Sequence, residues 1–182
     1  MLTGGNFYGG HIALAMDALK AALASAADLA DRQIALLVDG RFNRGLPGNL
    51  APAGGPDCAL HHGFKGAQIT ASALTAEMQK NAMPAAVFSR STEAHNQDKV
   101  SLGTIAARDA ARQCELGARV AAIHWLAAAQ ACRLRGSLAT RPALGPLAEW
   151  ALAQAGLDGR DRPLDATIER LAQAILAGAA AG

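Results

Sequence analysis

The amino-acid sequence predicts an all-α protein, a bundle of a few long helices. Alanine and leucine dominate a chain of 182 residues that is 51% hydrophobic and only 4% aromatic, a composition that favours helix over sheet. Apolar residues recur every three or four positions over long segments, as they do on one side of an α-helix, and no segment is a convincing strand. The length is that of one domain. We expect core helices over residues 1–136 and short helices of the same domain over residues 137–182.

The first helix is predicted from about His11 to Val38. Its apolar residues form one seam, at Ile12, Met16, Leu19, Leu23, Ala26, Ala30, Ile34 and Leu37. The charged residues fall off that seam, at Asp17, Lys20, Asp28, Asp31 and Arg32. A helix of this length is typical of a bundle.

Glycine and proline predict a loop over Asp39–Gly63, followed by a second helix at about Phe64–Asn81. The loop is longer than passive connectors usually are, which suggests a functional or interface role. Cys58, His61 and His62 are metal-binding residue types within it. They lack a second cluster of ligands, so we predict no metal site.

The third helix is predicted from about Thr92 to Arg135, with Ser91 or Thr92 as its N-cap. If the helix starts there, Glu93 and Gln97 are four residues apart and project from one face. A carboxylate and an amide at a positively polarised helix start could bind an amino acid or receive a proton. The alternative is a solvated, well-capped helix end.

The rest of the chain is predicted to form two short helices, at about Leu147–Ala155 and Leu164–Ala177, after a break at Gly136–Pro146. Asp165 is a candidate cap for the last helix.

Charge and cysteine content limit the classes of function. The net charge of +2 comes from scattered residues without a basic run, so nucleic acid is not implied. Cys114 and Cys132 are too far apart on one predicted helix to pair, which fits a reducing compartment. The start of the chain does not resemble a signal peptide, and the apolar run Leu171–Ala181 is too short to span a bilayer. We therefore expect a cytoplasmic protein that does not enter a membrane.

Three stretches in order resemble segments of the aromatic amino acid ammonia-lyases and aminomutases. They are Gly4-Gly-Asn-Phe-Tyr-Gly9 with Ala15-Met-Asp17, Arg32-Gln-Ile-Ala-Leu-Leu-Val-Asp39 with Gly45-Leu-Pro47, and Glu93-Ala-His-Asn-Gln-Asp98 with Ser101-Leu-Gly103. The resemblance runs from about Gly4 to Arg135 and is to the C-terminal part of those enzymes.

The resemblance implies a homotetramer whose long helices form a shared bundle and whose active sites combine residues of several subunits. It implies the electrophile methylidene-imidazolone, formed from an internal Ala-Ser-Gly, and elimination of ammonia from an aromatic amino acid. By position, Asn6 would bind the substrate carboxylate or order the cofactor region, and Phe7 would line the aromatic pocket. Glu93 and Gln97 would face the amino group and the electrophile. The amide at Gln97 favours phenylalanine or tyrosine over histidine as substrate.

The sequence also departs from the family. It contains no Ala-Ser-Gly and no Tyr-Ser-x-Arg segment, and its one tyrosine is Tyr8. We therefore expect this chain alone to be inactive, as the C-terminal portion of a lyase that needs an N-terminal part. The alternative is a catalytically silent helical oligomerisation module derived from the same family, in which Asn6 and Phe7 are a plain helix leader. In either case the apolar seams exceed what so few helices can bury, so we expect a dimer or tetramer.

Overall fold

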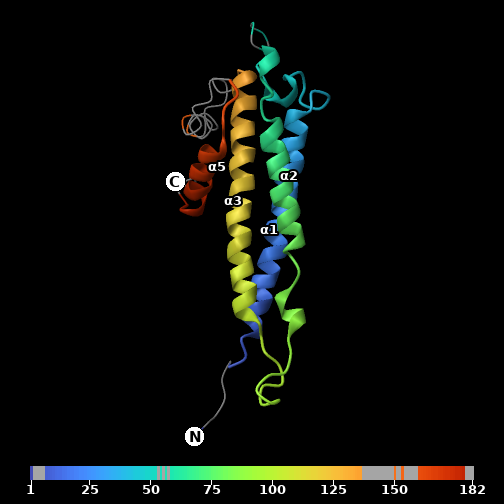
Figure 1. Cartoon of the computed structure of the whole chain (residues 1–182), viewed down its shortest axis with the longest axis vertical. Coiled ribbons are helices and arrows are strands. Elements are labelled where there is room, and N and C mark those ends of the chain that lie inside the picture. The colour runs from blue at the N-terminus through green and yellow to red at the C-terminus, as the bar shows by residue number, and fades with distance from the viewer. Residues whose placement is uncertain are drawn as a thin grey trace.

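The computed structural model of the chain describes residues 1, 7–52, 54, 56, 58–136, 150, 153 and 160–178. Three long helices lie side by side, namely α1 (Gly10–Val38), α2 (Lys65–Lys80) and α3 (Gly103–Leu134) (Figure 1). The shorter α5 (Asp165–Leu176) packs against α3, which contacts all of the others. Short 3-10 helices lie in the connecting segments, η1 at Gly48–Leu50, η2 at Cys58–Leu60 and η3 at Ala85–Phe88. The described residues contain no β-strand, and the predicted all-α class is confirmed.

The boundaries of α1, α2 and α5 agree with the prediction to within one or two residues. The start of α3 does not, because this helix begins at Gly103 rather than Thr92. Asp165 is the first residue of α5 and makes no side-chain cap, so its predicted role as a cap is wrong. The helix predicted at Leu147–Ala155 lies mostly outside the described residues. None of the described helices combines the length and apolar character that crossing a membrane requires.

The buried side of α1 is not the predicted seam. The buried residues are Ala13, Asp17, Lys20, Ala24, Ala27, Asp31 and Ile34. They recur every three or four positions, but the side they share is rotated so that Leu19 and Ile12 of the predicted seam stay 38% and 50% exposed. Ile34 of the predicted seam is fully buried, and Met16, Leu23 and Ala30 pack against the core as partly buried residues, so the seam overlaps the buried side only in part. Three charged residues enter the interior.

Each buried charge on α1 has partners on neighbouring segments. Lys20 is fully buried, and its Nζ lies 2.9 Å from Asp17 Oδ1 and 3.5 Å from Asp109 Oδ2. Further along, Asp31 accepts a hydrogen bond of 2.7 Å from Ser72 Oγ on α2 and pairs with the adjacent Arg32. Such partners are required, because an isolated charge in the interior is very costly.

The largest apolar cluster lies around the second half of α3. Leu126 and Leu171 are almost fully buried in it, which ties α5 to α3, while Leu50 and Phe64 cover it from the loop and the start of α2. Alanine fills many of the remaining contact positions, at Ala118, Ala122, Ala127, Ala131 and Ala172. Small side chains of this kind let the helix backbones approach closely.

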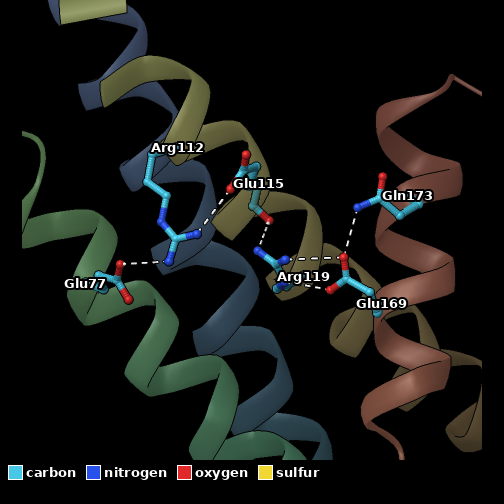
Figure 2. Close-up of polar contacts among 6 residues, drawn as sticks. All are labelled: Glu77, Arg112, Glu115, Arg119, Glu169 and Gln173. Carbon is cyan, nitrogen blue, oxygen red and sulfur yellow. Dashed lines mark hydrogen bonds and ion pairs between the residues drawn. The ribbon is translucent and has the colours of Figure 1, made fainter. Parts of the chain in front are cut away.

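A polar network on the surface connects α2, α3 and α5 (Figure 2). Its members are Glu77 on α2, Arg112, Glu115 and Arg119 on α3, and Glu169 and Gln173 on α5. Arg112 reaches Glu77 at 3.3 Å and Glu115 at 3.1 Å, and Arg119 Nε donates to Glu169 Oε2 at 2.9 Å. Contact with Gln173 and Arg119 lowers the pKa of Glu169. These pairs are partly solvated, so they orient the helices more than they stabilise them.

Candidate functional site

The residues predicted to carry chemistry lie on a loop between η3 and α3, spanning residues 89–102. Thr92 N donates to Gln97 O at 2.9 Å, Gln97 N donates to Thr92 O at 3.3 Å, and Asn96 N donates to Glu93 O at 3.0 Å. These bonds close a tight turn. The predicted helix face shared by Glu93 and Gln97 is therefore wrong, and both residues belong to this turn instead.

The predicted caps are also wrong. Ser91 Oγ lies 2.9 Å from His95 Nδ1 within the turn, and Thr92 pairs through its backbone. The N-cap position of α3 is Leu102, whose backbone is left-handed with φ 55° and which makes no side-chain cap.

The turn carries unusual backbone geometry. Glu93, Ala94 and His95 have φ values of 54°, 50° and 71°, so three consecutive residues with a Cβ adopt the left-handed region. This conformation costs about 1–2 kcal/mol per residue for side chains other than glycine. Strained backbone of this kind clusters at functional sites, where the surrounding structure holds it. The turn is therefore the strongest functional candidate that backbone geometry indicates among the described residues.

The side chains of the turn are accessible. The Glu93 carboxylate is exposed and accepts a hydrogen bond of 3.2 Å from Asn96 Nδ2, while Gln97 is partly buried. One carboxylate and one amide on an exposed turn can bind a charged amino group or exchange a proton with it.

The start of α1 lies at the same end of the bundle as this loop (Figure 1). A Cβ atom at Gly9 would lie only 3.2 Å from Ser101 Oγ, and one at Gly103 would lie 3.6 Å from Gly9 O. The first distance is tighter than most Cβ contacts, so glycine at Gly9 favours this close approach, whereas the second is an ordinary contact. Phe7 is 92% exposed beside it, and Asn6 lies outside the described residues. Two of the stretches singled out in the sequence thus meet, although they are about ninety positions apart in the chain.

The base of the loop is held by a polar contact that the sequence analysis missed. Both carboxylate oxygens of Asp17 accept backbone N–H groups at the start of η3, from Ala85 at 2.9 Å and from Ala86 at 3.0 Å. Burial would raise the pKa of Asp17, but these bonds and Lys20 outweigh it, so the pKa is lowered. Two charges three residues apart, within an apolar first half of the helix, were the signal that could have indicated it.

A second polar contact joins the long loop to the segment before α5. Gly63 N donates to the Asp161 carboxylate at 2.8 Å, His62 N donates to the same carboxylate, and Asp161 N donates to His61 Nδ1 at 3.2 Å. His61 is thus occupied by a structural contact, and Cys58 is exposed. Within the described part of the chain, no group of three or more His, Cys, Asp or Glu side chains could hold a metal ion.

Comparison with known proteins identifies the family. The model of the aromatic amino acid lyase family matches residues 1–172. The tyrosine ammonia-lyase of Cereibacter sphaeroides is 47% identical over 180 residues, which cover 96% of this chain and 33% of that enzyme. The crystal structure of histidine ammonia-lyase from Trypanosoma cruzi matches with a TM-score of 0.88 at 31% identity, covering 98% of this chain and 34% of that one. The tyrosine aminomutase of Streptomyces globisporus matches with a TM-score of 0.84 at 36% identity, over 97% and 33% of the two chains.

The chain therefore belongs to the aromatic amino acid lyase family, as the three stretches predicted. It spans about a third of the length of the relatives that it matches.

Proposed function

We propose that this chain forms part of an ammonia-lyase that acts on an aromatic amino acid, and that Asn6, Phe7, Glu93 and Gln97 contribute to its substrate site. One observation carries the proposal. The glycine-rich start of α1 and the strained turn at Glu93–Gln97, two stretches shared with the family, lie at one end of the bundle with Gly9 against Ser101.

The side chains suit the parts of such a substrate. The exposed Glu93 carboxylate can pair with the substrate ammonium group or accept a proton from it, and the Gln97 amide can donate to or accept from the same group. The exposed ring of Phe7 can pack against an aromatic side chain. Asn6 would complete the set by binding the substrate carboxylate.

The cofactor of the family does not fit the residues of this chain. Methylidene-imidazolone requires an Ala-Ser-Gly segment, and the sequence contains none. The carboxylate and the amide of the turn can contact a substrate, but they cannot form the electrophile. The electrophile and the remaining site residues would therefore come from outside this sequence, and we derive no reaction step through that group.

The surface of α1 supports assembly into a dimer or tetramer. Leu29 and Leu36 are exposed on the side of α1 opposite its buried face, and Ile12, Leu14 and Leu19 are exposed on its flanks. A helix that is apolar on most of its circumference is normally buried. Contact with further helices, from other copies of the chain or from the missing part of the lyase, would cover these residues.

A chimera tests the proposal. Residues 1–172 replace the matching third of the Cereibacter sphaeroides tyrosine ammonia-lyase, which supplies the rest of the family sequence. We expect the purified chimera to assemble and to convert tyrosine or phenylalanine into ammonia and an arylacrylate. The ultraviolet absorbance of the arylacrylate measures the reaction. A chimera that assembles like its parent but stays inactive with aromatic amino acids would contradict the proposal.

The second candidate is a catalytically silent oligomerisation module. The missing Ala-Ser-Gly and the exposure of Glu93 favour it. It predicts that the chimera assembles normally without activity, which is the outcome that separates the two candidates.

A further inference from the structure

We propose that Asp17 and Lys20 are positioning residues for the loop that carries Glu93 and Gln97. The inference rests on the proposed function only in assigning the loop a role in substrate binding. That this buried pair fixes the position at which the loop leaves the bundle follows from the contacts of Asp17 and Lys20 alone.

The pair joins three elements at the base of the loop. Asp17 binds the N–H groups of Ala85 and Ala86 at the start of η3. The Lys20 ammonium has three donors and three acceptors within reach, which are Asp17 Oδ1, Asp109 Oδ2 on α3, and the carbonyl oxygen of Met83 at 2.8 Å. The segment 83–86 is therefore bonded to α1 through the C=O group of Met83 and the N–H groups of Ala85 and Ala86.

Apolar packing is weak at this corner. The buried residues of the local cluster are the small Ala13, Ala85 and Ala106, with only the partly buried Met16 and Ala86 packed against them, and the larger side chains of Val87 and Phe88 are 66% and 52% exposed. A hollow of about 270 Å³ beside the corner is lined in part by Phe88, Leu102 and Ile105. Because alanine buries little area, the hydrogen bonds of Asp17 and Lys20 are the main restraint on the position of η3.

The position of η3 is passed on to the turn. Ser89 Oγ donates to Val100 O at 2.6 Å, and Val100 N donates to Arg90 O at 3.3 Å, so the two arms of the loop are tied together. A displacement of the first arm therefore moves the second, and with it the turn between them.

Amide hydrogen exchange of the purified chain tests the inference without any need for activity. Asp17→Asn keeps the shape of the side chain but removes its charge and one of its two acceptor oxygens. We expect exchange of residues 85–101 to become at least about tenfold faster, since bonds to a buried charge are among the strong ones, while the amides of α2 and the second half of α3 keep their rates.

The matched control is Asp31→Asn, which removes another buried carboxylate of the same helix. Asp31 bonds Ser72 on α2 and not the loop. A general loss of stability would accelerate exchange in both variants and throughout the chain. Equal acceleration of residues 85–101 in both variants, or none in Asp17→Asn, would overturn the inference.

A second variant covers the case in which Asp17→Asn does not fold. The double substitution Asp17→Leu with Lys20→Met removes both buried charges and leaves only Asp109, whose side chain is 44% exposed, without its Lys20 partner, a change that buried ion pairs often tolerate. We expect a helical far-ultraviolet spectrum with the same fast exchange over residues 85–101. A folded double variant with wild-type exchange in that segment would refute the inference.

The chimera adds a functional readout. Asp17→Asn should lower kcat more than it changes KM, because the loop is misplaced while substrate contacts from elsewhere remain, and Asp31→Asn should not. If the unsubstituted chimera is inactive, the proposed function fails while the exchange result still decides the positioning role. If the chimera is active and both variants keep its kcat, the positioning role fails alone.

Discussion

At the scale of single residues, Asp39 at the end of α1 gives a direct electrostatic test. Arg41 donates to its carboxylate from Nη2 at 2.6 Å and from its backbone N at 2.9 Å, and these bonds lower the pKa of Asp39 to about 2. Because the pKa is lower in the folded state, Asp39 stabilises the fold at pH values above its ordinary pKa of about 3.9. This contribution is lost as the pH falls towards 2.

Arg41→Gln should therefore raise the pKa of Asp39 part of the way towards its ordinary value, because the side-chain bond is lost and the backbone bond remains. Carboxyl carbon shifts followed by NMR between about pH 1.5 and 6 measure the change. The variant should therefore be less stable than the wild type at pH 7, and this difference should shrink as the pH falls below about 4 towards 2, where Asp39 is protonated in both. A pKa that stays near 2 in the variant would show that Arg41 is not the cause.

Glu93 and Gln97 give the residue-scale test of the proposed site. In the chimera, Glu93→Gln and Gln97→Ala should each lower kcat/KM, by about 10²-fold or more for Glu93 if it moves a proton. Asp98→Asn is the control, since Asp98 is an exposed carboxylate of the same loop outside the turn. Steady-state rates measure the effect, and sedimentation should show unchanged assembly. Loss of assembly in the Glu93 or Gln97 variants would mean that the turn is structural.

At the scale of elements, Leu171 is the largest fully buried side chain through which α5 reaches the core, with Ala172 buried beside it. Leu171 is 1% exposed and packs in the cluster that contains Leu126, whereas Leu176 on the same helix is 46% exposed. Leu171→Ala should lower the free energy of unfolding by about 2–5 kcal/mol, as truncation of a buried leucine does. Urea unfolding followed by circular dichroism measures it, with Leu176→Ala as the control, for which we expect a change of less than about 0.5 kcal/mol. Equal effects of the two variants would contradict the docking of α5 described here.

The extents of the long helices were predictable because their apolar residues are periodic over many turns. The start of α3 was not, because Ser91 and Thr92 have the residue types of helix caps and the following residues tolerate a helix. What decides the structure there is a left-handed backbone at Glu93, Ala94 and His95, and the residue types of Glu93 and Ala94 do not indicate positive φ.

The buried side of α1 was unpredictable for another reason. Alanine and leucine occur around most of its circumference, so the periodicity fits more than one rotation of the helix. The choice was made by long-range contacts of Asp17 and Lys20 with residues near position 85, which no local pattern reveals. For the candidate site, the sequence predicts Glu93 and Gln97 as site residues, but it does not predict the turn in which the structure places them.

At the scale of the whole molecule, the exposed apolar surface predicts self-association. Leu29→Glu places a charge at the centre of the exposed side of α1 and should shift the chain towards monomer. The reason is that burying an ion at an interface costs several kcal/mol, on the order of the cost in a protein interior. Sedimentation velocity measures the distribution. Leu60→Glu is the control, because Leu60 is exposed on the long loop and away from α1. A wild-type chain that sediments as a stable monomer would contradict the prediction.

The incomplete site predicts that the purified chain is silent. Without an Ala-Ser-Gly segment it should show no near-ultraviolet band of methylidene-imidazolone. It should also release no ammonia from phenylalanine, tyrosine or histidine, because a carboxylate and an amide alone lack an electrophile. Spectra and a coupled ammonia assay decide this, and activity of the isolated chain would overturn the proposed division of the site.

The three buried charges of α1 have a consequence for how uniquely the bundle assembles. A helix coated with alanine and leucine could rotate, or slide by one turn, against its neighbours with little loss of apolar contact. Asp17, Lys20 and Asp31 each satisfy their hydrogen bonds in one alignment. Any other alignment would leave at least one of these ions without a partner in the interior, at a cost of several kcal/mol. These residues therefore favour one rotation and one register of α1 against its neighbours. Every copy of the chain would then present the same surface when the bundles assemble.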